Sequence, residues 1–103
     1  MGNGLRAALT GFGSYVPEKV LTNQDLTRMV DTSDEWITQR TGIKERRIAA
    51  EHESTASMAT EAGRRACQNA GLDPSQLELI ACATISPETL CPGSACYIQR
   101  DLG

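Results

Sequence analysis

The sequence predicts an α/β fold, because short apolar runs alternate along it with helical patterns. The run Leu77–Thr84 (LELIACAT) is typical of a central strand that is covered on both faces. Before it, a helix that begins at Ser54 or Thr55 carries small residues in steps of three and four. A first strand is expected over Leu5–Val16, where apolar residues also gather. The predicted order is strand, two short helices, strand, long helix, strand and helix.

The first predicted strand contains Gly11-Phe12-Gly13, which matches the start of a dinucleotide-binding loop. Val16 stands where the third glycine of that motif should be, and Pro17 follows instead of a helix. We therefore exclude a dinucleotide site. The two glycines are interpreted as positions where another backbone segment approaches closely.

A short helix is expected to begin at Thr22. Asp25 falls at its third position, and Leu21 can pack on Leu26 as a hydrophobic staple. The residues expected on its buried face follow the helical period and are Leu26, Met29 and Val30.

The stretch Asp31–Gly42 (DTSDEWITQRTG) predicts a second short helix. Thr32 and Glu35 have the spacing of a capping box, and the final glycine is expected to close the helix in the left-handed conformation. Trp36 and Arg40 are four residues apart and so share one helix face. An indole and a guanidinium held together can clasp a flat aromatic ligand, and the arginine can also reach a phosphate. Spacing by itself favours the alternative, an ordinary surface pair.

A strand or extended segment is expected over Lys44–Ile48, so the two short helices form an insertion between core elements. Lys44, Arg46 and Arg47 are clustered bases. A solvated edge is the favoured interpretation, and attraction of an acidic carrier protein or a phosphate is the alternative.

The long helix should be buried between other elements, because the residues of its apolar stripe are all small. The stripe consists of Ala59, Ala62, Gly63, Ala66, Cys67 and Ala70. The exposed face is expected to carry Thr60, Glu61, Arg64, Arg65 and Gln68. Gly71 should end the helix, with Leu72 folding back on Cys67. One further turn is expected at Asp73–Gln76, with Pro74 at its first helical position.

The last part of the chain is predicted as a loop over Ser86–Cys91 and a helix that begins at Pro92. The packing residues of this helix are expected to be Ala95, Ile98 and Leu102.

Composition narrows the function classes. At 103 residues there is room for one small domain, and a net charge of −3 argues against a nucleic-acid binder. No apolar run reaches membrane-spanning length, and the N-terminus lacks a signal peptide's long apolar region. The four cysteines form no C-x-x-C pair, so we expect reduced thiols in a cytoplasmic protein and no metal site. His52 is expected to be a solvated loop residue.

The sequence TSDEWI-x-x-RTGI at Thr32–Ile43 resembles the signature of β-ketoacyl-acyl-carrier-protein synthase III, the initiating condensing enzyme of type II fatty-acid synthesis. The segments GFGSYVPEKVLTNQDL, RRIA and CPGSACYIQRDLG resemble that family in order and spacing as well. The resemblance runs from Leu5 to Gly103. It implies that residues 1–103 are the incomplete N-terminal part of a thiolase-like fold, the first half of its first βαβαβ repeat with a helical insertion.

The resemblance implies an acyltransferase that condenses an acyl-coenzyme A primer with malonyl-acyl carrier protein and releases CO2 and coenzyme A, with no prosthetic group. Trp36 and Arg40 would hold the adenine of coenzyme A, with Thr32 nearby. The family's catalytic cysteine, histidine and asparagine lie beyond the matched segment, so no catalytic residue is assigned in this chain. Cys96 is rejected as a nucleophile because it is expected on the packing side of the last helix. Cys67 and Cys82 are expected to be small buried residues.

Cys91 matches a family position at the interface of a homodimer, where one subunit helps to close the acyl pocket of the other. Members of the family often carry a bulky aromatic residue there, so the smaller thiol implies longer or branched primers. The alternative is that Leu90 or a later residue refills the space. Two other functions stay open, a related condensing enzyme of secondary metabolism and a scaffold that kept the fold without the chemistry.

Overall fold

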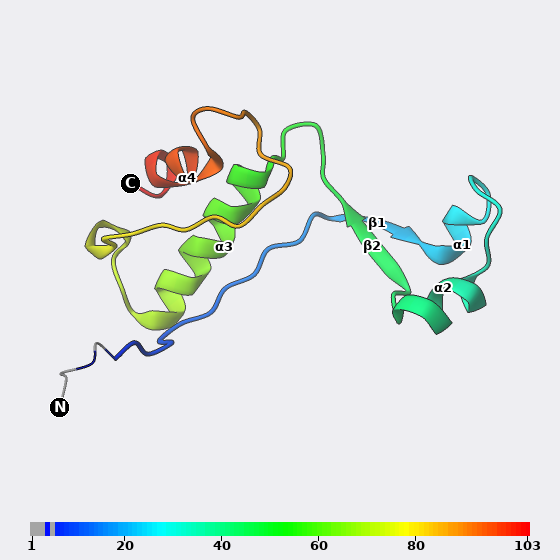
Figure 1. Ribbon diagram of the computed structural model, residues 1–103, viewed down its shortest axis with the longest axis horizontal. Helices are drawn as coiled ribbons and strands as arrows, with labels where there is room; N and C mark the ends of the chain where they lie inside the picture. The colour runs from blue at the N-terminus through cyan, green and yellow to red at the C-terminus, as the bar shows by residue number, and fades with distance from the viewer. Residues whose placement is uncertain (1–3, 5) are drawn as a thin grey trace. The chain divides into compact units, whose positions relative to one another are not determined.

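The computed structural model describes residue 4 and residues 6–103. It divides into two compact units, which are described separately (Figure 1). One unit is Val16–Ser54, and the other consists of the segment up to Tyr15 together with Thr55–Gly103. Within the described part of the chain, no helix combines the length and the apolar composition needed to cross a membrane.

The unit Val16–Ser54 is a β-hairpin whose connection carries two helices (Figure 1). Strand β1 (Lys19–Thr22) pairs antiparallel with β2 (Glu45–Ile48), so that Lys19 lies opposite Ile48. Helices α1 (Asn23–Leu26) and α2 (Asp34–Thr41) lie between the strands along the chain. The strand predicted within Lys44–Ile48 is confirmed. Its partner β1 was not predicted, since four residues close to Pro17 give too weak a strand signal.

Helix α1 begins as predicted and ends earlier. The Thr22 hydroxyl accepts a hydrogen bond from the Asp25 amide at 3.1 Å, and the Asp25 carboxylate accepts one from the Thr22 amide at 3.0 Å. This capping box confirms the predicted start. The predicted buried face is wrong, because Met29 and Val30 are 69% and 57% exposed. The helix ends at Leu26, so Met29 and Val30 lie beyond it and do not extend its buried face.

The segment before Tyr15 belongs to the other unit and runs alongside α3 (Thr55–Ala70) (Figure 1). The prediction of a strand over Leu5–Val16 is wrong for residues 6–16, and Leu5 lies outside the described residues. A strand needs a hydrogen-bonded neighbour, and the described residues offer none to this segment.

The two glycines of this segment meet the backbone of α3. A Cβ atom at Gly13 would lie 2.2 Å from the Ala62 carbonyl oxygen, and one at Gly11 would lie 2.5 Å from the Ala66 carbonyl oxygen. The prediction that these glycines permit a close backbone approach is therefore confirmed, and the approaching backbone is a helix.

Helix α3 has the predicted ends and a different buried face. Gly71 adopts φ 66°, and the Leu72 amide donates to the Cys67 carbonyl at 2.9 Å, which is the predicted closure. Of the predicted stripe only Cys67 is buried, and its other residues are half-buried, whereas Ala56, outside the stripe, is buried. Thr60 was expected on the exposed face and is only 6% exposed, so that prediction is wrong. The following turn, η1 (Pro74–Gln76), is capped by Asp73 as predicted.

Helix α4 (Ser94–Leu102) packs on α3 and starts two residues after the predicted Pro92. Ile98 is buried and Leu102 is half-buried, as expected for its packing face. Glu88 joins the starts of the two helices, since its carboxylate accepts hydrogen bonds from the Ala56 amide of α3 and from the Ser94 hydroxyl of α4. Cys96 was expected to be packed and is exposed, because it falls on the opposite side of α4.

The prediction of a central strand over Leu77–Thr84 is wrong for this chain. The segment makes no ladder hydrogen bonds, and Leu79 is 83% exposed. Its apolar residues have the composition of a covered strand, yet the described residues supply no strand to pair with it. Ser86–Cys91 is a loop, as predicted.

Candidate functional site

Helix α2 is set by two local signals. Its N-cap is Ser33, whose hydroxyl accepts a hydrogen bond from the Trp36 amide at 3.1 Å. The predicted capping box of Thr32 and Glu35 is therefore wrong by one residue, and Glu35 instead accepts a hydrogen bond from Gln39 at 3.3 Å. Gly42 closes the helix at φ 71°, which confirms the predicted left-handed end.

The predicted pair of Trp36 and Arg40 is formed. The guanidinium carbon of Arg40 lies 5.1 Å from the centroid of the Trp36 ring, within cation–π range. Both side chains are exposed, Trp36 by 55%. Among the described residues Arg40 forms no ion pair, so its N–H groups stay available to a ligand.

A hollow of about 340 Å³ lies beside this pair and is lined by Asp31, Thr32, Ser33 and Trp36. Thr32 and Trp36 both line it, whereas Arg40 contacts the Trp36 ring and is not part of the lining. Asp31 was missed by the sequence analysis. It lies two residues before Ser33, the cap of α2, where the chain enters the helix. An exposed ring beside hydroxyl and carboxylate groups suits a flat polar heterocycle.

Two of the three clustered bases after α2, Arg46 and Arg47, form hydrogen bonds within the unit Val16–Ser54. Arg46 donates to the Asn23 side chain at 3.0 Å, and Arg47 donates to the Pro17 carbonyl at 3.1 Å. Lys44 is exposed. Two of the three bases therefore have structural partners.

Cys91 is exposed in the loop before α4, and its peptide bond to Pro92 is cis. The neighbouring Leu90 is 96% exposed. All four cysteines are free. Cys67 is buried as expected, whereas Cys82 was also expected to be buried and is only half-buried, because no strand among the described residues pairs with its segment. No group of three or more His, Cys, Asp or Glu in the described residues is placed to hold a metal ion.

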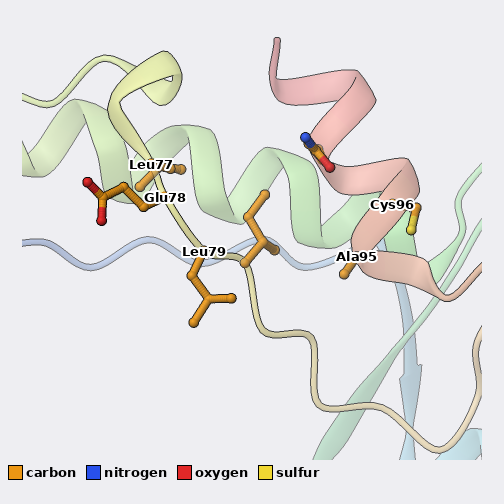
Figure 2. Close-up of a pocket in the computed structure, with 7 residues that line it drawn as sticks. Leu77, Glu78, Leu79, Ala95 and Cys96 are labelled. Carbon is orange, nitrogen blue, oxygen red and sulfur yellow. The ribbon is translucent and has the colours of Figure 1, made fainter.

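A second hollow, of about 260 Å³, lies between the segment Leu77–Ile80 and α4. Figure 2 shows Leu77, Glu78 and Leu79 on one side of it and Ala95 and Cys96 on the other. Its lining is mainly apolar and contains no histidine.

With this geometry in hand, comparison with known proteins identifies the relatives of the chain. No protein-family model matches it. It is 54% identical, over 99 residues, to the β-ketoacyl-[acyl-carrier-protein] synthase III of Caldanaerobacter subterraneus subsp. tengcongensis. The match covers 96% of this chain and 30% of that enzyme. The chain thus spans about 30% of the length of the curated relatives it matches.

Solved structures agree with the sequence comparison. The 3-oxoacyl-[acyl-carrier-protein] synthase III of Aquifex aeolicus VF5 superposes with a TM-score of 0.85 at 54% identity, over 90% of this chain and 30% of the other. The priming β-ketosynthase of the R1128 polyketide pathway gives a TM-score of 0.87 at 35% identity, over 97% of this chain and 32% of the other. The resemblance and the fold class predicted from it are therefore confirmed. The chain is homologous to a segment of these enzymes and has part of their thiolase-like fold.

Proposed function

We propose that this chain is the N-terminal part of a β-ketoacyl-acyl-carrier-protein synthase III and that α2 binds the nucleotide of its acyl-coenzyme A primer. The observation that carries the proposal is the exposed cation–π pair of Trp36 and Arg40 beside a polar hollow. The homology to that enzyme over 96% of the chain supports the reaction class.

The proposed contributions follow from the chemistry of each side chain. The exposed Trp36 ring offers a stacking surface for adenine, and Arg40 on the same face can donate to a phosphate. Thr32 lines the hollow and can hydrogen-bond the edge of the base. This chain would then bind and orient the primer. The acyl transfer and the decarboxylative condensation would fall to residues outside residues 1–103.

The whole protein would act as a homodimer in the cytoplasm and would use malonyl-acyl carrier protein as its second substrate. Cys91 would lie at the subunit interface, next to the acyl pocket of the partner.

Replacement of Trp36 tests the nucleotide site. In the whole protein that carries this chain, Trp36→Ala should weaken acyl-coenzyme A binding by about 1–3 kcal/mol, the scale of a base stacked on an aromatic ring. Gln39→Ala is the matched control, because Gln39 is exposed on the same helix and its side chain hydrogen-bonds to Glu35, away from the lining of the hollow. Calorimetric titration of both variants measures the difference. Equal affinity of Trp36→Ala and wild type would remove α2 from the binding site.

A second candidate is a priming ketosynthase of polyketide synthesis, which the 35% identity and the TM-score of 0.87 to the R1128 enzyme support. Turnover with carrier proteins of the two pathways would separate the candidates.

A scaffold that kept the fold without the chemistry is the third candidate. Incubation with labelled acyl-coenzyme A tests it, because a condensing enzyme forms a covalent acyl-enzyme and a scaffold does not.

A further inference from the structure

Asn23 is buried to a degree that is unusual for a polar side chain. It is 1% exposed and is the first residue of α1, within the unit Val16–Ser54. An amide that is removed from water must find hydrogen-bond partners, because a buried polar group without one costs several kcal/mol. The hydrogen-bond partners of the Asn23 side chain show which segments it holds in place.

Its amide group bonds to both ends of α2. The Nδ2 atom donates to the Asp34 carboxylate at 2.7 Å and to the Ile43 carbonyl oxygen at 2.8 Å. Asp34 is the first residue of α2, and Ile43 follows the glycine that ends it. One side chain therefore holds both the first residue of α2 and the segment that follows its end.

The opposite side of Asn23 is fixed to β2. Its Oδ1 atom accepts a hydrogen bond from Arg46 at 3.0 Å, and its backbone amide donates to the Lys44 carbonyl at 3.1 Å. Asn23 thus ties α2 to the hairpin, with both of its side-chain atoms in use.

Helix α2 has few other anchors. It is eight residues long, too short to be stable in isolation. Among its residues only Ile37 is buried, while Trp36 and Arg40 on the ligand face are exposed. The orientation of this face therefore depends on Ile37 and on the hydrogen bonds of Asn23.

We propose that Asn23 is a positioning residue, which holds α2 so that Trp36 and Arg40 present one preorganised face to the nucleotide of acyl-coenzyme A. This inference rests on the proposed function of α2. It predicts that Asn23 affects recognition of the nucleotide and leaves recognition of the acyl-pantetheine arm unchanged.

The experiment compares two substrates with the whole protein that carries this chain, acyl-coenzyme A and the matching acyl-pantetheine, which lacks the nucleotide. Asn23→Asp keeps the size of the side chain and the acceptor for Arg46. It loses the two donors and brings a second carboxylate next to Asp34. We expect KM for acyl-coenzyme A to rise about 10- to 100-fold, as for a misplaced binding group. The kcat and KM for acyl-pantetheine should stay at their wild-type values.

A milder variant covers the case in which Asn23→Asp does not fold. Asp34→Ala removes one hydrogen-bond partner of Asn23. Because Asp34 is exposed, this substitution places no new charge in a buried site. It should raise KM for acyl-coenzyme A in the same direction by a smaller factor. Glu35→Ala is the matched control, because it removes a carboxylate from the same helical turn that accepts a hydrogen bond from Gln39 and not from Asn23. It should behave as wild type.

The outcomes separate this inference from the proposed function. A wild-type protein that uses acyl-pantetheine as well as acyl-coenzyme A overturns the nucleotide site, and the role of Asn23 with it. If wild type prefers acyl-coenzyme A and the Asn23 and Asp34 variants keep that preference, the positioning role alone is overturned. Equal losses with both substrates would mean that Asn23 supports the fold in general, which also overturns it.

Discussion

Two of the three arginine–aromatic pairs among the described residues show how the surroundings of an arginine decide whether it is available to a ligand. Arg65 lies 5.4 Å from the Tyr15 ring, much as Arg40 lies on Trp36. Arg65 also donates to the Ser14 carbonyl at 2.9 Å and pairs with Glu61 at 2.9 Å. It is committed to holding the N-terminal segment on α3. Arg40 has no ion pair among the described residues, and this leaves it the better candidate for a ligand.

Cys91 is predicted to set the range of primers. A thiol is much smaller than a phenyl ring, and each added buried methylene is worth about 0.8 kcal/mol, or roughly fourfold in affinity. The whole protein should therefore accept acyl groups longer than acetyl, or branched ones, and Cys91→Phe should shift the preference toward acetyl. A primer series from acetyl- to octanoyl-coenzyme A measures this. If both proteins prefer acetyl to the same degree, another residue limits the pocket.

The Asp25 carboxylate is predicted to stabilise the fold above acidic pH. Hydrogen bonds from the Thr22 hydroxyl and amide, with the Arg28 charge as a smaller contribution, lower the pKa of Asp25 below its ordinary 3.8. The folded state thus favours the ionised form. The stabilisation is complete above the unfolded pKa and is lost as the pH falls through the lower folded pKa. Carboxyl NMR titration of the whole protein should give a pKa for Asp25 under 3.8. A value at or above 3.8 would mean that the cap is open in solution.

At the scale of elements, Gly13 is predicted to be required for the contact between the N-terminal segment and α3. A Cβ atom there would lie 2.2 Å from the Ala62 carbonyl oxygen and 2.4 Å from the Ala66 amide, both of them backbone atoms that cannot rotate away. Gly13→Ala should lower the free energy of unfolding of the whole protein by about 1–3 kcal/mol, as overpacking does.

Gly4→Ala is the matched control, because a Cβ atom at Gly4 would have nothing within 4 Å. Denaturant unfolding of the two variants measures the difference. Equal midpoints would show that the segment leaves α3 readily and that its contact adds little stability.

At the scale of the whole molecule, residues 1–103 made alone are predicted to fold poorly. The buried apolar residues among those described are few, namely Ile37, Ala56, Cys67 and Ile98. Large apolar side chains remain exposed, including Leu79 at 83%, Ile85 at 103% and Leu90 at 96%. Apolar surface of this extent favours association. The isolated chain should show broad thermal unfolding and concentration-dependent size. A sharp transition from a monomer in calorimetry and ultracentrifugation would contradict this.

The sequence alone predicted most of the features that depend on neighbours a few residues away, with the cap of α2, which is Ser33 and not Thr32, as an exception. The cap at Thr22, the left-handed end at Gly42 and the closure at Gly71 each arise from hydrogen bonds within about one helical turn. The shared face of Trp36 and Arg40 follows from the same local periodicity. Interactions between residues this close along the chain can be recognised in a short stretch of sequence.

Only the tertiary structure decided the features that depend on distant partners. The apolar composition of Leu77–Thr84 predicts a strand, yet a strand exists only when another segment supplies its hydrogen bonds, and none of the described residues does. Asn23 likewise looks like an ordinary helix-start residue. Its burial and its hold on α2 depend on Ile43 and Arg46, which are 20 and 23 residues away along the chain. Local sequence fixes local geometry, whereas pairing and burial are settled by residues that folding brings together.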